Sequence, residues 1–595
     1  MRLNCCVTLS LATALLVGVT AAPTVAQVLP TVTADVVVTA STTPVPAATV
    51  GRTVITLTRE ELSRLGVSSV IDGLRLLPGL DPKARGGRDV QTDFSVRGAT
   101  FGQALVLIDG VRLNNAQSGH HNGEVPAPLL GIDRIEVVAG PASAVHGADA
   151  LGGTIQILTR TDPHLTAEAS LAEFGTLAAQ ASASGGFLPA AWTMSAWGAR
   201  SDGFMFDRDY GQGGASVRGR LRSGLIVDAR HQRRAFGANG FYGNSPSKEW
   251  TDGTIVSAVW SVSNATWFTQ TRLAARRHHD RFRWDIRRPG FAENTHSSDA
   301  VDADLTVSRQ QNARLRVNIG AGGGGDWIDS SNLGDRTYGR VYGFAETLWS
   351  PTSRVSVQTG ARVDHYSTFG TAWNPSVALS AVVNDRVRLR GSVARAFRIP
   401  TFTERYYTDP GHQASAMLNP EQGWSVDVGL EVATAGWTLG LSPFTRWDED
   451  VIDWVKDLPT DRWRTTNVHD VTTRGVEISA ARRWAAALVR AHYSWLDVDA
   501  TKAAPISKYV LEYARQSAGL AASVPTGWQT QLAVTADARD RVDGQKYVLV
   551  GARLTRPVGR VDAYVEGTNL LDKTYREIAG VPMPGRTLGI GLRVR

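Results

Sequence analysis

Two adjacent histidines are the residues best suited to ligand chemistry in the first quarter of the chain. His120 and His121 follow Gln117 in a polar stretch that ends at Asn122. Neighbouring side chains point to opposite faces of an extended chain, so adjacent histidines share a metal ion only where a tight turn brings them together. We therefore predict no metal site here. Gln117, His120 and His121 are candidates for hydrogen bonding to a ligand, and the alternative is plain loop surface.

An arginine-rich segment offers a second kind of chemistry, the recognition of anions. Residues 272–288 contain seven arginines against two aspartates, a net charge of +5, with aromatic residues interspersed. A basic, aromatic-lined vestibule concentrates anionic ligands. The ligand-binding candidates in this segment are Arg281, Arg283, Trp284 and Arg287. Contact with the anionic lipid of an outer leaflet is the alternative, and nucleic acid is not an expected partner.

Catalytic chemistry finds no support in the sequence. We find no supported Ser-His-Asp, HExxH or phosphate-loop constellation. The two cysteines, Cys5 and Cys6, are adjacent and lie within the first ten residues, so nothing downstream can form a disulfide or a cysteine-based metal centre. The sequence predicts a protein that is not an enzyme and has no catalytic residue, no cofactor and no resident metal.

The N-terminus indicates export. Arg2, the apolar run from Val7 to Ala22 and the small residues that end at Ala26 have the three regions of a secretory signal. We predict a signal peptide over residues 1–26, cleaved after Ala26. No later segment has 18 consecutive apolar residues, so any membrane crossing must be made by the strands of a barrel.

Alternation dominates the chain from about residue 161 onward. Between Arg354 and Asp364, apolar and small residues alternate with polar ones, and the same pattern fills the last eight residues, from Leu588 to Arg595. Tryptophans recur near the expected strand ends, as in aromatic girdles. At about 20 residues for each strand and its connection, this region holds 20 to 24 strands, and a lumen of that width needs a plug.

The region before these strands has a different sequence pattern. Residues 50–160 have short apolar runs separated by Gly, Pro and Asp, with one helix expected over Arg59 to Leu77, which begins near Thr58. We predict a small α+β domain, which is the obvious candidate for the plug.

Several segments resemble TonB-dependent outer-membrane receptors. The plug-like blocks are Phe94–Gly98, Val106–Arg112, Ile132–Val137, Gly140–Gly147 and Gly152–Ile157, and the barrel blocks are Ala396–Pro400, Leu418–Glu421 and Val565–Tyr575. A short Val-rich stretch resembles the family's energy-coupling segment, the TonB box, with residues Asp35, Val36, Val37, Val38, Thr39 and Ala40.

This resemblance implies a fold and a domain order. We expect an all-β transmembrane barrel of 22 antiparallel strands with an N-terminal α+β plug inside its lumen. The expected domains are a signal peptide (1–26), an N-terminal segment (27–49) that contains the TonB box (35–40), the plug (50–160) and the barrel (161–595). The family places plug arginines against barrel glutamates, and the matching positions are Arg97, Arg134, Glu431 and Glu477.

The resemblance also implies a function, TonB-dependent active transport of a scarce metal chelate across the outer membrane. A ferric siderophore is our first choice of ligand, cobalamin the alternative, and haem, for which His412 is the candidate ligand, comes third. A passive porin is the alternative from another class. The expected partners are TonB with its inner-membrane energising complex, the transported ligand and outer-membrane lipid, and the protein is expected to act as a monomer.

Overall fold

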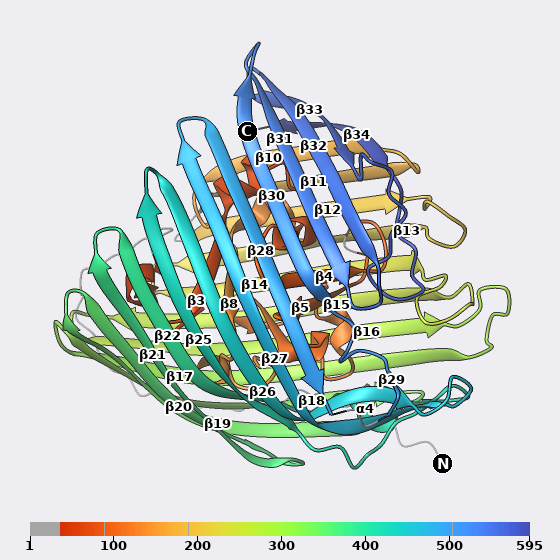
Figure 1. The fold of residues 1–595 in the computed structure, drawn as a ribbon, viewed down its shortest axis with the longest axis horizontal. Coiled ribbons are helices and arrows are strands. Elements are labelled where there is room, and N and C mark those ends of the chain that lie inside the picture. Colours follow the sequence, from red (N-terminus) through yellow and green to blue (C-terminus); the bar gives the residue numbers. More distant parts are fainter. Residues whose placement is uncertain (1–35, 38, 89, 188–189, 502–503, 595) are drawn as a thin grey trace.

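The computed structural model describes residues 36–37, 39–88, 90–187, 190–501 and 504–594. The predicted signal peptide, and Asp35 and Val38 of the predicted TonB box, lie outside the described residues. Within these residues, 22 antiparallel strands close into a barrel, and the N-terminal domain, drawn in red and orange, lies inside it (Figure 1). This confirms the predicted fold class.

The barrel runs in sequence order around the wall, and its last strand pairs with its first. Its first half comprises β10 (His164–Ala172), β11 (Thr176–Phe187), β12 (Ala190–Ser201), β13 (Tyr210–Leu221), β14 (Leu225–Gly237), β15 (Lys248–Ser263), β16 (Trp267–Arg283), β17 (Glu293–Asn312), β18 (Leu315–Ser330), β19 (Arg336–Thr352) and β20 (Val355–Tyr366). Its second half comprises β21 (Gly370–Asn384), β22 (Val387–Arg398), β25 (Glu421–Thr434), β26 (Trp437–Lys456), β27 (Trp463–Trp484), β28 (Ala487–Ala500), β30 (Ala514–Thr526), β31 (Thr530–Arg541), β32 (Lys546–Val558), β33 (Val561–Thr568) and β34 (Thr587–Val594). Shorter elements in the loops are α4 (Phe402–Tyr406), β23 (Thr408–Asp409), β24 (His412–Gln413) and β29 (Ile506–Ser507).

Alternation along the strands separates an apolar outer face from a polar inner face. In β34, Leu588, Ile590 and Leu592 are exposed on the outside, whereas Arg593 points inward and bonds to Glu168 of β10. These positions confirm the predicted alternation at the C-terminus. Among the described residues, no helix is long and apolar enough to cross a bilayer.

The two ends of the barrel differ in their connections. At one end, two-residue turns join neighbouring strands, as between Thr352 and Val355 or between Asn384 and Val387. At the other end, long loops such as residues 238–247, 284–292 and 399–420 connect them. We call these the short-turn end and the long-loop end. In bacterial outer-membrane barrels, short turns face the periplasm and long loops face outward.

The plug is an α+β domain with its own apolar core. A five-stranded sheet in the order β3-β8-β9-β6-β7 packs against short helices and a β4–β5 hairpin. Its elements are β3 (Thr53–Thr58), α1 (Arg59–Arg64), α2 (Val70–Arg75), β4 (Leu80–Ala84), β5 (Thr92–Val96), η2 (Phe101–Gln103), β6 (Ala104–Ile108), β7 (Val111–Arg112), η3 (Gly119–His121), η4 (Leu129–Gly131), β8 (Ile132–Ala139), α3 (Ser143–His146) and β9 (Gly153–Thr159).

The single helix expected over Arg59 to Leu77 is wrong, because the chain forms two helices there. Helix α1 begins with a capping box, in which Thr58 and Glu61 bond reciprocally, and it ends at Arg64. Gly66 then adopts a φ of 66°, which is readily accessible to glycine and interrupts the helical path. Ser69 caps the start of α2 through the main-chain NH of Asp72.

Candidate functional site

A buried arginine fastens the plug to the barrel. Arg97, at the end of β5, donates to Glu477 of β27 through Nε (2.9 Å) and NH2 (2.7 Å), and its NH1 lies 2.8 Å from Asp427 of β25. Its guanidinium also stacks over Phe444 at 4.1 Å. Breaking such a buried pair leaves an uncompensated charge, so this contact holds the plug strongly. The Arg97 and Glu477 positions therefore meet as the resemblance implied.

The other two positions implied by the resemblance make contacts within their own domains. Arg134 bonds through Nε to Glu136 (2.8 Å) and through NH1 to Asp133 (3.1 Å), both within β8. Glu431 of β25 lies 2.8 Å from Arg388, which faces it from the neighbouring barrel strand β22. These contacts do not support a bridge between plug and barrel at Arg134 or Glu431, and that bridge stays a prediction. Arg134 and Glu136 are two residues apart in a strand and share a face, which favours the local pair.

A cavity of about 160 Å³ lies where the plug faces the long-loop end. We call it the apical pocket, and its lining includes Gln117, His120, His121, Trp284, Tyr407 and Tyr509. Four of the seven sequence candidates for ligand binding, Gln117, His120, His121 and Trp284, thus line one pocket. Side chains from β15 to β17 form its barrel side.

His120 and His121 lie in the tight turn η3 and point to different partners. His120 Nδ1 is 2.9 Å from Asp93 Oδ1, and its ring stacks on Phe101 at 4.4 Å. Burial and the charge of Arg85 outweigh the effect of Asp93 and lower the pKa of His120. The ring of His120 is thus engaged by Asp93 and Phe101.

His121 instead joins side chains that are remote in sequence. Its Nδ1 lies 3.2 Å from Glu124 Oε1, and its Nε2 lies 3.9 Å from Asp280 Oδ2. Burial acts to lower the pKa of His121, but the hydrogen bond to Glu124 and the charges of Glu124 and Asp280 raise it to about 9. Glu249 of β15 and His278 of β16 complete two triads whose ligand atoms lie within 4.8 Å of one another. This geometry suits a cation.

The predicted basic vestibule is wrong. Arg281 stacks over Trp250 at 4.0 Å, Arg283 bonds to Glu293 at 2.7 Å, and Arg287 bonds to Asp285 at 2.9 Å. None of these three arginines lines the apical pocket. The odd residues of β16 face outward and its even residues face the plug, so parity places Arg281 and Arg283 on the outer surface.

The same parity identifies residues that the sequence reasoning missed. His278, Asp280 and Phe282 are even-numbered residues of β16, and Asp280 accepts a 3.0 Å hydrogen bond from Gln117 Nε2. Assigning alternate residues of the arginine-rich segment to opposite faces of a strand would have separated these inner residues from the outer arginines. Glu249 gives no comparable signal, because its proximity to His121 depends on how the plug seats in the barrel.

His412 also lines the apical pocket. Its Nδ1 lies 3.0 Å from Asp409 Oδ1, and its ring meets Trp454 edge-on at 5.3 Å. Nearby Lys508 is half-buried, and desolvation, with the charge of Arg85, lowers its pKa to about 8. The long-loop side of the pocket thus carries Glu404, Asp409 and Lys508 beside its aromatic residues, and the barrel strands contribute the carboxylates of Glu249 and Asp280.

The predicted coupling segment lies at the opposite end of the plug. Strand β1 (Val36–Val37) pairs with β2 (Val45–Pro46), followed by η1 (Ala47–Thr49), and Thr39 and Ala40 are buried. Arg316, close to a short turn, donates to the Pro44 carbonyl at 3.2 Å. The segment therefore lies near the short-turn end, folded back on itself rather than presented as a free edge.

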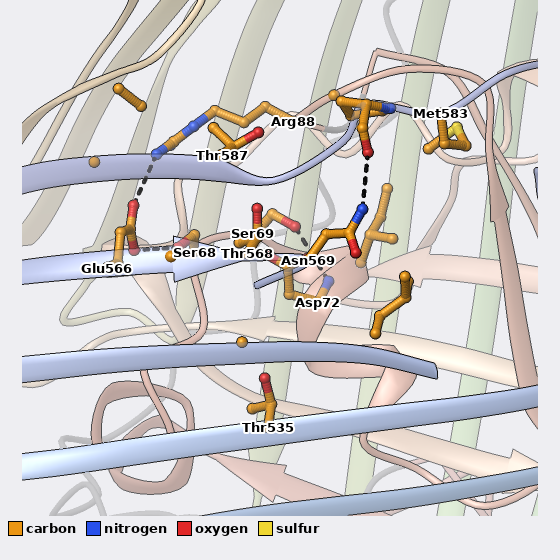
Figure 2. Close-up of a pocket in the computed structure, with 18 of the residues that line it drawn as sticks. Ser68, Ser69, Asp72, Arg88, Thr535, Glu566, Thr568, Asn569, Met583 and Thr587 are labelled. Carbon is orange, nitrogen blue, oxygen red and sulfur yellow. Dashed lines mark hydrogen bonds and ion pairs between the residues drawn. The ribbon is translucent and has the colours of Figure 1, made fainter. Parts of the chain in front are cut away.

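A second cavity, of about 280 Å³, separates α2 from the barrel wall (Figure 2). Arg88 lies 3.5 Å from Glu566 of β33, and Ser68 donates to the same carboxylate at 3.0 Å. Here an ion pair and a hydrogen bond beside open space join the plug to the barrel wall.

Two family models match the chain. The model of the TonB-dependent receptor-like β-barrel matches residues 169–574, and that of the TonB-dependent receptor plug domain matches residues 46–154. Together they leave unmatched only the first 45 residues, a short connection and the last 21 residues.

Similar proteins are known from sequence and from solved structures. The vitamin B12 transporter BtuB of Vibrio vulnificus strain YJ016 is 26% identical over 481 residues, 75% of each chain, and that of Photobacterium profundum is 24% identical. The siderophore receptor PirA of Acinetobacter baumannii superposes with a TM-score of 0.76 at 14% identity, over 91% of this chain and 98% of that one. A ferric enterobactin receptor mutant of Pseudomonas aeruginosa gives a TM-score of 0.73 at 16% identity, over 91% and 98%. At such identities the structures establish the fold alone.

Proposed function

Because this chain belongs to the TonB-dependent receptors of the outer membrane, we propose that it imports a scarce metal-containing nutrient by a TonB-driven movement of its plug. The nutrient binds in the apical pocket at the long-loop end. TonB acts on residues 35–40 at the short-turn end, where a short extended segment can pair with a partner strand through its main chain.

The observation that carries this proposal is the connection between the two ends through one strand of the plug. The loop that bears His121 leads through η4 into β8. Glu136 of β8 in turn accepts hydrogen bonds from the hydroxyl and the main-chain NH of Thr39, at 2.7 and 3.1 Å. A change in the apical loop therefore has a short route to the coupling segment.

A ferric siderophore remains the first candidate ligand, although the basic vestibule no longer supports it. Its remaining support is the aromatic side of the apical pocket, where Phe282, Trp284 and Tyr407 can pack against flat organic groups. Cobalamin is the second candidate, because the similar curated proteins are named vitamin B12 transporters.

A receptor deletion separates these candidates. The deletion strain is grown under iron limitation with single siderophores and, separately, under dependence on added cobalamin, each with and without the receptor gene restored. Loss of growth on one supplement, reversed by the gene, identifies the ligand. A passive porin would keep the same uptake in a strain without TonB, and that result would refute energised import.

A further inference from the structure

The apical pocket contains a group of buried histidine and carboxylate side chains that the proposed uptake of a preformed chelate does not require. We call it the His–carboxylate cluster: His121 and Glu124 of the plug, with Glu249, His278 and Asp280 of the barrel. All five residues are buried. Two plug residues and three barrel residues thus converge at one point of the interface.

Three members of the cluster, His121, Glu249 and Asp280, both line the pocket and lie within reach of a single ion. Their ligand atoms are within 4.8 Å of one another, and His121 Nε2 faces Asp280 Oδ2 at 3.9 Å. Glu124 accepts from the opposite ring nitrogen, Nδ1, at 3.2 Å. A carboxylate on one imidazole nitrogen fixes the tautomer and the orientation of the ring, so that the other nitrogen is ready to bind a metal.

Asp280 Oδ2 accepts from Gln117 and faces His121, but Asp280 Oδ1 and the Glu249 carboxylate lack the partners that buried carboxylates require. Glu249 is 3% exposed, and its carboxylate makes no hydrogen bond or ion pair with any described residue. Asp280 Oδ1 is buried and likewise has no hydrogen-bond partner in the described part of the chain. Buried carboxylates are normally paired or coordinate a metal, because leaving them unpaired is costly. Two of them side by side therefore indicate a missing cation or a bound proton.

The types of the donor atoms define the class of cation. One imidazole nitrogen with two carboxylates suits divalent first-row transition metals, whereas calcium and magnesium prefer sites made of oxygen alone. Thiolate ligation, which selects copper(I), is excluded because the only cysteines are Cys5 and Cys6.

We propose that His121, Glu249 and Asp280 bind a divalent first-row transition-metal ion directly, with Glu124 as the residue that positions His121. The remaining coordination positions are open to water or to a weak chelator. The site is divided between plug and barrel, so a plug movement that withdraws His121 leaves the ion with the two barrel carboxylates alone. This release step rests on the proposed function, whereas the binding step does not.

Zinc binding to the purified full-length receptor tests the site. Isothermal titration with Zn²⁺ alone should give one tight site per wild-type chain. Glu249→Gln and Asp280→Asn should each weaken binding by about tenfold or more, and Glu124→Gln by about 10- to 100-fold, as for other residues that orient a metal ligand. Matched controls are Asp252→Asn and His279→Gln, which lie in the same two strands on the outer face and should bind as the wild type does.

A spectroscopic measurement keeps the test decisive if a variant folds poorly. X-ray absorption of the zinc-loaded wild-type receptor should show imidazole nitrogen in the first shell, and that signal should be lost in His121→Gln. Absence of a tight zinc site in the wild-type receptor, or equal affinity in Glu249→Gln, Asp280→Asn and the controls, would overturn the proposal. Zinc binding without receptor-dependent ⁶⁵Zn uptake would keep the site and refute zinc as cargo. Energised uptake of a siderophore or cobalamin without zinc binding would keep the proposed function and refute the site.

Discussion

The Thr39 hydroxyl donates a 2.7 Å hydrogen bond to Glu136 Oε2, which joins the predicted coupling segment to the central sheet of the plug. The other oxygen of Glu136 accepts from Arg134 at 2.8 Å, and His146 Nε2 lies 2.8 Å from the Thr39 carbonyl oxygen. Thr39 therefore holds the segment inside the lumen through both its side chain and its main chain. We call the contacts of Thr39 with Glu136 and His146 the latch. On the proposed assignment of residues 35–40 to TonB, these contacts must break before TonB engages the segment fully.

Removal of the Thr39 hydroxyl should loosen this latch. Hydrogen bonds to charged groups contribute about 1.5–3 kcal/mol, so Thr39→Val should speed amide exchange in residues 39–46 by roughly 10- to 100-fold. Hydrogen–deuterium exchange with mass spectrometry measures this effect. Thr49→Val is the control, because the Thr49 hydroxyl makes only an exposed local bond to Pro46. Equal exchange in the two variants would show that the Glu136 contact does not hold the segment.

Acidification should loosen the same latch through His146. Burial and the charges of Arg272, Arg362 and Arg112 outweigh the hydrogen bond to Thr39 and lower the pKa of His146 to about 4. The latched state therefore binds fewer protons than a released, solvated state between about pH 4 and 6.5. The contribution of His146 to the latch is thus complete above pH 6.5 and declines as the pH falls toward 4.

Amide exchange of residues 39–46, corrected for the intrinsic pH effect, checks this sign. Protection should fall between pH 7 and pH 5 in the wild-type protein, and His146→Gln should flatten the dependence. The carboxylates of Glu136 and Glu346 also face the segment. An unchanged slope in His146→Gln would contradict the role assigned to His146.

Loss of Arg97 should destabilise the plug within its barrel. Arg97→Met leaves Glu477 and Asp427 buried without their cation, which costs about 3–5 kcal/mol. Amide exchange in β5 and β6 should then accelerate by about 100-fold or more. Arg277→Met is the matched control, because Arg277 forms an exposed pair with Asp299, and such pairs contribute at most about 1 kcal/mol. Similar effects in both variants would contradict the role assigned to Arg97.

Ligand binding should depend on the pocket side chains and not on the outer arginines. Trp284→Ala should weaken binding of the nutrient identified by the deletion experiment, because the indole lines the apical pocket. Arg281→Gln should leave the affinity unchanged, since Arg281 stacks on Trp250 outside the pocket. Binding of labelled nutrient to whole cells measures both. Unchanged binding in Trp284→Ala with weakened binding in Arg281→Gln would support the basic vestibule instead.

Local periodicity predicted the strands, because each strand carries its own signal, whereas the barrel was predicted from the export signal, the aromatic residues at strand ends and the length of the region. Alternation such as Leu588, Ile590 and Leu592 on one face follows from the geometry of a strand, whatever its neighbours. The helix after Thr58 was expected to be one element, because apolar spacing does not reveal that Gly66 reverses the sign of φ. Element types were thus easier to predict than their interruptions.

The candidate site was less predictable than the fold, because its residues come partly from the plug and partly from the barrel. Arg97 was identified by resemblance, whereas Arg134 bonds to Glu136, a partner only two residues away that the resemblance did not indicate. The meeting of His121 with Asp280 and Glu249 depends on the depth and rotation of the plug inside the barrel. No pattern within a single strand encodes that relation.

The central claim, that TonB drives import by engaging residues 35–40, is tested most directly by Val37→Pro. Proline removes a main-chain donor from the extended segment, whereas Val37→Ala keeps it and serves as the control. Surface binding and energised uptake of the identified nutrient are measured in the same cells. The account predicts normal binding with uptake abolished in Val37→Pro and normal uptake in Val37→Ala. Wild-type uptake by Val37→Pro would contradict it.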